Sequence, residues 1–380
     1  MTILSQRRHW LQQCAAGLAA WPLAAAQAQG SSKAAERPIL VAQLADMSPS
    51  QQDVSRDFLV GSRAAWQSLN ARGGIHGQPV QHWVIEVQGQ GQALRQAWQE
   101  VQAQPACVAL SGCVGDGLAA ALASLQNQAG AASTLAQSAP WLHSQDSPSE
   151  RVFPVFSGYQ AQIIHALKSL ASMGVRELGV VYASQAMLQQ SQHWVRQAAQ
   201  SLGLSLHALP IPGSQPQAER QLAAPAQALL LFIGGTPELH SFTGRLRLPP
   251  GRHCYIVALA DVNLQVLAQM GAMARNVSVI ATQSVPSVSA SLPIVRAYRE
   301  ALARLYDEPP SPQGLAGFIA ARYTAQLLQG LNGPITRASV LAALRRRPAI
   351  DLGGFAIEAD GPSPAYVTQS MLAADGRIVG

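Results

Sequence analysis

Short apolar runs alternate with amphipathic segments along most of this chain, and this alternation constrains the fold more than any other feature of the sequence. Short apolar runs bounded by turn residues are typical of strands that are buried on both faces of a parallel sheet. A repeated strand–helix–strand order joins parallel strands by right-handed crossovers. We therefore expect an α/β protein with Rossmann-like parallel sheets.

The alternation falls into two consecutive blocks, which predicts two lobes. The amphipathic helices expected after residue 292 are best explained if the chain then returns to the first lobe. Two open sheets that face each other bring the carboxyl ends of their strands to one cleft, where such sheets bind ligands. The expected bounds are residues 38–153 with 285–352 for lobe 1, and residues 154–284 with 353–380 for lobe 2.

Two segments interrupt the regular alternation. Residues 210–227 are rich in Pro, Gln and Ala, and we expect them to be a connection between two strands. Residues 355–358 and 366–372 are expected to be the two strands of a terminal hairpin.

Residues 106–125 carry the strongest local signal for a ligand site. An apolar run at 106–110 predicts a buried strand, and a turn with three glycines follows at 112–117. Ala and Leu dominate from Leu118 onward, so a helix is expected to start there. Backbone N–H groups at such a helix N-terminus suit a carboxylate or a phosphate. The alternative is an ordinary strand–helix connection that binds nothing.

Composition argues against several functions. Charged residues are only 12% of the chain, the formal net charge is +6, and no basic stretch is interleaved with aromatic residues, so nucleic-acid binding has no support. No nucleophile elbow, zinc-protease motif or phosphate-binding Walker loop is present, and the glycine turn does not fit a dinucleotide fingerprint. We expect no enzyme activity, no cofactor and no metal.

The N-terminus has the pattern of an export signal. Arg7 and Arg8 precede an apolar segment at 14–26 that is too short to span a bilayer, and the small residues around Ala28 suit cleavage. The paired arginines resemble a twin-arginine signal, with Sec export as the alternative. We expect residues 1–28 to be removed and the mature protein to be soluble in the periplasm.

Three cysteines remain after this cleavage: Cys107, Cys113 and Cys254. The periplasm permits a disulfide, but an odd number leaves at least one thiol free. Cys107 and Cys254 lie in apolar strand-like runs, where a buried and unreactive thiol is the usual state.

Several segments, in order, resemble the type I periplasmic solute-binding proteins of the leucine/isoleucine/valine-binding family. The similar segments are residues 69–77 (LNARGGIHG), the glycine turn at 111–117, residues 316–322 (AGFIAAR), residues 351–355 (DLGGF) and residues 375–377 (DGR). The resemblance implies two lobes joined by three crossover segments. It also implies a monomer that captures a small amino-acid-like solute by hinge closure and delivers it to the membrane permease of an ABC importer.

The resemblance also implies a set of ligand-binding residues. In lobe 1, the backbone N–H groups of Cys113, Val114 and Gly115 would bind a ligand carboxylate, and the loop at Ser138 and Ala139 would add a hydroxyl and a carbonyl. In lobe 2, Tyr159 would cover the ligand, Thr236 would line the same face, and Asp261 would accept the α-ammonium group. Asp116 belongs to the same first loop.

Differences from the family leave the cargo open. The first loop holds Val114, Gly115 and Asp116 where relatives have hydroxyl residues, and a carboxylate at Asp116 would repel a ligand carboxylate unless it points away. Asp116 and Asp261 could also cap helices, and Tyr159 could be a hinge-packing aromatic. A periplasmic sensor of amides or small carboxylates, acting on a membrane signalling partner, is the alternative function.

Overall fold

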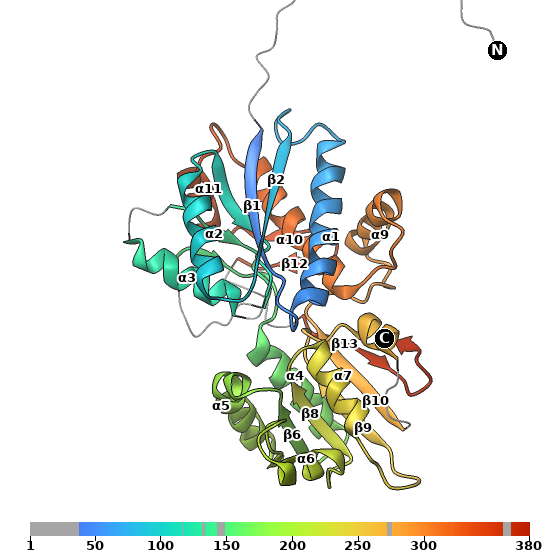
Figure 1. The fold of residues 1–380 in the computed structure, drawn as a ribbon. Coiled ribbons are helices and arrows are strands. Elements are labelled where there is room, and N and C mark those ends of the chain that lie inside the picture. Colours follow the sequence, from blue (N-terminus) through green and yellow to red (C-terminus); the bar gives the residue numbers. More distant parts are fainter. Residues whose placement is uncertain (1–37, 116, 131–133, 143–148, 272–275, 360–365) are drawn as a thin grey trace, which may run out of the picture. The chain divides into compact units, whose positions relative to one another are not determined.

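The computed structural model describes residues 38–115, 117–130, 134–142, 149–271, 276–359 and 366–380. The predicted export segment at residues 1–28 lies outside the described residues. Two parallel-dominated sheets with helices on both faces, shown in Figure 1, confirm the predicted α/β fold. We call the part built on the first sheet lobe 1 and the part built on the second sheet lobe 2.

The sheet of lobe 1 is fully parallel, with the strand order β2-β1-β3-β4-β5. Its strands are β1 (Ile39–Asp46), β2 (Val80–Val87), β3 (Cys107–Ser111), β4 (Gln137–Ser138) and β5 (Val152–Phe153). The helices of this lobe are α1 (Gln52–Asn70), α2 (Gln92–Ala103), α3 (Leu118–Gln128), α9 (Pro293–Leu305), α10 (Pro312–Gln329) and α11 (Arg337–Arg345).

Strand β1 is buried on both faces, as its continuous apolar run predicts. Val41 belongs to the hydrophobic cluster that contains Phe58 of α1 and Phe318 of α10. Leu44 faces the other way, into the cluster that contains Trp98 of α2. Helices therefore cover both faces of the sheet, so we expect a site at its carboxyl edge, where open α/β sheets bind ligands.

The sheet of lobe 2 has the order β14-β13-β10-β9-β8-β6-β7, and β13 and β14 are its antiparallel members. Its strands are β6 (Glu177–Tyr182), β7 (Ser205–Ala208), β8 (Leu229–Ile233), β9 (Cys254–Ala258), β10 (Val277–Gln283), β13 (Thr368–Leu372) and β14 (Ile378–Val379). Its helices are α4 (Tyr159–Ser172), α5 (Gln185–Leu202), α6 (Pro216–Ala223), α7 (Thr236–Arg245) and α8 (Leu264–Met270).

Two local predictions need correction. The connection at 210–227 contains the short helix α6, which begins with Pro216 at a first-turn position where proline suits a helix. The predicted terminal hairpin is wrong: β12 (Ala356–Ile357) pairs with β11 (Ile350–Asp351), and β13 pairs with β10 and β14. The tight turn lies after β13, where the Ala373 N–H donates to the Arg377 carbonyl and Gly376 has a φ of 83°.

The order of the described elements takes the chain between the lobes three times: from β5 to α4, from β10 to α9, and from β12 to β13. The amide of Gln162, on α4, is fully buried where the first two passes meet. Its nitrogen donates to the Ser157 carbonyl and to Ser284 Oγ, both at 3.0 Å. Its oxygen accepts from the Ala260 N–H at 2.9 Å and from Thr282 Oγ1 at 2.8 Å. One side chain thus joins the first two passes to the end of β9.

Hydroxyl groups tie the third pass to the other two. Ser157 Oγ donates to the Tyr366 carbonyl at 3.2 Å, and Ser284 Oγ donates to the Ser157 carbonyl at 2.7 Å. Thr368 Oγ1 donates to the Val285 carbonyl at 2.8 Å. We call this set, together with Gln162, the hinge network.

We expect Gln162→Leu to lower the free energy of unfolding by about 3 kcal/mol, because it leaves buried donors and acceptors without partners. Urea denaturation measures this loss. The control is Gln189→Leu, at an exposed position of α5, which should change stability by no more than about 0.5 kcal/mol. Equal urea concentrations at the unfolding midpoints of the two variants would contradict the stabilising role of the Gln162 amide.

Candidate functional site

The strand, glycine turn and helix predicted at residues 106–125 are present as β3, a loop and α3. Gly117 caps α3 with a φ of 65°, and Gly112 has a φ of 64°, so both occupy the left-handed region that favours glycine. A Cβ on Gly115 would lie 2.4 Å from the Asp46 Cβ, so only glycine fits beside the end of β1.

Not all N–H groups of this loop are available to a ligand. The Val114 N–H donates to the Leu44 carbonyl at 3.0 Å, contrary to the expectation that it would bind a ligand carboxylate. The N–H groups of Cys113 and Gly115 make no hydrogen bond within the part of the chain that the structure describes. Asp116 lies outside the described residues. Of the three predicted donors, the N–H groups of Cys113 and Gly115 thus stay available among the described residues.

The Cys113 side chain takes no part in chemistry at this loop. It is free, almost fully buried and packed in the cluster under α3. Burial raises the pKa of its thiol to about 12, so the thiol stays protonated and unreactive at neutral pH. Cys107 and Cys254 are also free and buried.

A buried amide and an imidazole fix the start of the loop. Gln43 Nε2 donates to the Gly112 carbonyl at 2.6 Å, and Gln43 Oε1 lies 2.7 Å from His82 Nε2. Because an amide oxygen only accepts, His82 carries its hydrogen on Nε2. Burial, helped by the charge of Arg63, lowers the pKa of His82 to about 4, so this arrangement is neutral at physiological pH.

The hydroxyl of Ser138 was expected to contact the ligand, but it binds inside lobe 1. Thr324 Oγ1, on α10, lies 2.8 Å from Ser138 Oγ and 2.7 Å from Ser111 Oγ. Thr324 gives its own hydrogen to the Ala320 carbonyl at 3.0 Å, so both serines donate to Thr324. This hydroxyl group fixes the ends of β3 and β4, from which the two predicted ligand loops start.

The second loop carries backbone strain that the sequence did not signal. Ala139 and Leu142 have φ values of 49° and 45°, which are uncommon for residues with a side chain. Between them lies Trp141, whose ring makes edge contacts with Phe58 and Phe156 at centroid distances of 5.7 and 5.4 Å. The second loop is thus anchored by Trp141 in an aromatic cluster. This cluster includes Phe156, which lies in the first pass between the lobes.

In lobe 2 the structure brings two of the predicted residues together. Tyr159, the first residue of α4, donates its hydroxyl to the carboxylate of Asp261, and both side chains are buried. Asp261 follows β9 but does not cap α8, because the side chain of Asn263 does so. Tyr159 and Asp261 thus form one unit at the carboxyl edge of the sheet.

Thr236, the third predicted residue of lobe 2, has a partner in lobe 1. Its hydroxyl donates to Asp53 Oδ2 of α1 at 2.5 Å and accepts from the Asn263 N–H at 2.9 Å. Its side chain is fully buried. The hydroxyl is therefore committed to a contact between the lobes.

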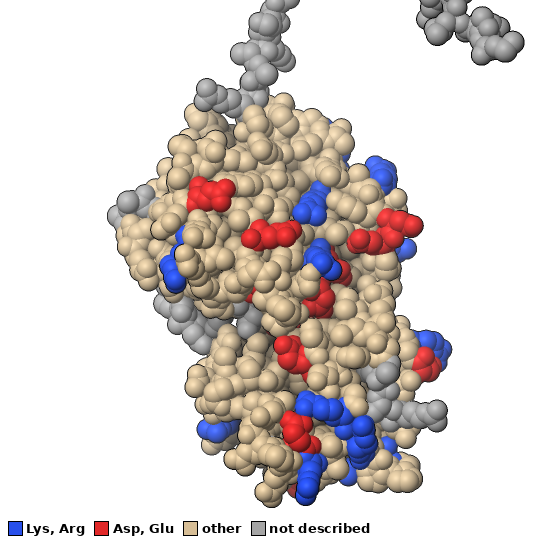
Figure 2. Space-filling view, viewed as in Figure 1, with Lys and Arg blue, Asp and Glu red and all other residues tan. Residues whose placement is uncertain are grey.

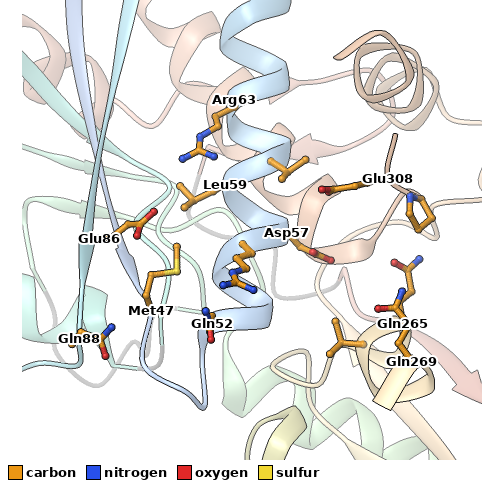
Figure 3. Close-up of a pocket in the computed structure, with 14 residues that line it drawn as sticks. Met47, Gln52, Asp57, Leu59, Arg63, Glu86, Gln88, Gln265, Gln269 and Glu308 are labelled. Carbon is orange, nitrogen blue, oxygen red and sulfur yellow. The ribbon is translucent and has the colours of Figure 1, made fainter. Parts of the chain in front are cut away.

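A cavity of about 670 Å³ lies along α1, between residues of both lobes. Figure 3 shows Asp57 and Arg63 of α1 on its wall, with Glu86 of β2 and with Gln265 and Gln269 of α8. None of the predicted site residues that the structure describes lines this cavity. It is distinct from the expected ligand site.

The distribution of charge on the described surface does not point to one kind of partner. Basic and acidic side chains are interspersed on the face shown in Figure 2. Within the described ranges, no three His, Cys, Asp or Glu side chains are grouped so as to hold a metal ion. No helix among the described residues has both the length and the apolar character that crossing a membrane requires.

Two α/β lobes that the chain links three times, with polar residues at the carboxyl edges of both sheets, define a bilobal ligand-binding protein. The family model described as "Periplasmic binding protein" matches residues 38–374. The chain belongs to this family, as its sequence resemblance indicates. A search of curated proteins gave no match.

Solved structures share this fold. An extracellular ligand-binding receptor from Verminephrobacter eiseniae is 20% identical, with a TM-score of 0.78 over 90% of this chain and 100% of the other. The branched-chain amino acid transporter substrate-binding protein LivJ from Streptococcus pneumoniae, solved with isoleucine, is 14% identical, with a TM-score of 0.71 over 90% and 98%. A fatty acid ABC transporter substrate-binding protein from Thermomonospora curvata is 18% identical, with a TM-score of 0.75 over 90% and 91%.

We expect Thr324→Val to loosen both predicted ligand loops, because the hydroxyls of Ser111 and Ser138 lose their common acceptor. Hydrogen exchange of the amides at 111–115 and 137–142 should accelerate, and the free energy of unfolding should fall by about 1–3 kcal/mol. Thr324→Ser keeps the acceptor and should leave loop exchange near the wild-type rate. Unchanged exchange in Thr324→Val would show that the loops are held by other contacts.

Proposed function

We propose that this protein is the substrate-binding component of an ABC importer and carries a small amino-acid-like solute between its lobes. The observation that carries the proposal is the Tyr159–Asp261 pair, a buried carboxylate held by a hydroxyl at the carboxyl edge of the lobe 2 sheet. Membership of the periplasmic binding protein family supports the binding role. Binding is non-covalent, and the protein performs no reaction.

Each lobe supplies a different part of the recognition. The N–H groups of Cys113 and Gly115 would bind the carboxylate of the solute, as backbone donors near a helix N-terminus do. Asp261 would accept the ammonium group, and Tyr159 orients the Asp261 carboxylate. Ala139 would contribute its backbone, whereas Ser138 and Thr236 would act by holding the loops and the lobes in place.

We infer the cellular role and the lobe bounds from the same comparison. Residues 1–28 would direct export to the periplasm, and the monomer would deliver its cargo to a membrane permease. The lobe bounds would be those predicted, residues 38–153 with 285–352 and residues 154–284 with 353–380, except that the last boundary would lie after Ile357, because β11 and β12 pair before the third pass.

The charge of Asp261, rather than similarity to solved structures, indicates which class of solute this protein would bind. The solved relatives include one named for fatty acids and one bound to isoleucine, so the shared fold accommodates both. A buried carboxylate at Asp261 opposes a ligand that carries only a negative charge, and it favours one that also carries an amine.

We expect an amino acid to raise the melting temperature of the mature protein in a thermal-shift panel of amino acids, amides, small carboxylates and fatty acids. At one hundred times the dissociation constant, a ligand that binds only the folded state adds about 2.7 kcal/mol of stability. Asp261→Asn should weaken binding of that ligand about 100-fold, because a buried charge pair is lost.

The matched control is Asp307→Asn, an exposed acid that should bind the ligand as the wild type does. If an amide or a carboxylate raised the melting temperature equally in the wild type and in Asp261→Asn, Asp261 would not be the partner of an ammonium group. If no compound of the panel raised the melting temperature, the transport proposal would be contradicted.

A further inference from the structure

Two carboxylates, one turn apart on α1, reach from lobe 1 to lobe 2. Asp53 Oδ2 accepts from the hydroxyl of Thr236 at 2.5 Å, and Asp57 Oδ2 accepts from Asn263 Nδ2 at 2.9 Å. Residues four apart lie on the same side of a helix, so both contacts form or break together as the lobes move. We call these four residues the interlobe clasp.

The lobe 2 side of the clasp is rigid. The Asn263 N–H donates to Thr236 Oγ1, which directs the hydroxyl hydrogen of Thr236 toward Asp53. Asn263 Oδ1 accepts from the first N–H groups of α8, which orients its amide nitrogen toward Asp57. Both residues are fully buried. The donors are therefore fixed in place, and the carboxylates dock onto them.

Two neighbouring bonds also cross between the lobes. Gln313 Nε2 of α10 donates to the Ala260 carbonyl at 3.0 Å, and Gln265 Nε2 of α8 donates to the Pro310 carbonyl at 2.6 Å. These bonds join neutral groups, so of the interlobe contacts named here only those of the clasp involve titratable groups.

Both clasp carboxylates are half-buried between the lobes. Burial raises the pKa of Asp53, and the charge of Asp57 raises it further, although the hydrogen bond from Thr236 acts in the other direction. Burial also raises the pKa of Asp57 despite hydrogen bonds from Ser311 and Asn263. No ion pair to either carboxylate is present among the residues that the structure describes.

Other titratable groups of the described residues lie around the clasp. Glu238 of α7 lies beside Gly235, next to Thr236, and Asp261 precedes Asn263 by two residues. Tyr298 of α9 lies within electrostatic range of Asp57 and Glu308, and burial raises its pKa to about 12. Arg56 lines the same cavity as Asp57 and Glu308, and its side chain is exposed to solvent.

We propose that the interlobe clasp makes closure of the lobes depend on pH, favouring the closed arrangement in acid and releasing it as the pH rises. When the lobes open, both carboxylates meet water and their pKa values return toward the ordinary 3.8. The closed form then binds more protons than the open form at pH values between the two sets of pKa values. Raising the pH through this window weakens closure, by up to about tenfold per pH unit for each carboxylate.

Small-angle X-ray scattering of cargo-free protein, refolded from denaturant to remove bound solute, tests the clasp without knowledge of the cargo. Between pH 4.5 and 7.5, the closed fraction of the wild type should fall and its radius of gyration should rise. The neutral variant Asp53→Asn/Asp57→Asn should keep one radius of gyration over the whole range.

Glu86→Gln is the matched control, because this exposed acid lines the same cavity but makes no bond to lobe 2 among the described residues. It should follow the wild-type pH response. Thr236→Val removes one donor and should be more open than the wild type at pH 4.5, which gives a second test if the double variant folds poorly. A wild type without a pH response, or a double variant that retains the response, would overturn the proposal.

Discussion

The hydrogen bonds of the Gln162 amide hold the junction on which the two lobes depend. The amide satisfies four groups from the first two passes and from the end of β9, and hydroxyl bonds tie in the third pass. A junction built from short directional bonds fixes where the lobes join, which is what the proposed hinge motion requires. The same position brings Tyr159, at the start of α4, to the Asp261 carboxylate.

Each predicted ligand loop is fixed by buried polar groups rather than by its own sequence. Gln43 holds the carbonyl of Gly112, and Thr324 accepts hydrogen bonds from serines at the ends of β3 and β4. Helix α10 supplies Thr324 to the loops and, from its first turn, sends Gln313 to the backbone of lobe 2. One helix thus contacts both the loops and the opposite lobe.

Sequence patterns predicted the parts of the structure that depend on interactions between residues close together in the chain. The strand, glycine turn and helix at 106–125 follow from an apolar run, glycines and helix formers, and the structure confirms them. The engagement of the Val114 N–H depends on how β1 pairs with the loop, which no local pattern reveals. The contact between Thr236 and Asp53 joins residues that lie 183 positions apart, so no local pattern reveals it. The Trp141 cluster was missed for the same reason.

Native mass spectrometry of the mature protein, mixed with the four solute classes of the panel, tests the central claim of cargo capture between the lobes most directly. The account predicts one complex with a single bound small molecule that contains an amine, and loss of that complex in Asp261→Asn but not in Asp307→Asn. No complex with any class at millimolar solute, or an equally stable complex in Asp261→Asn, would contradict the account.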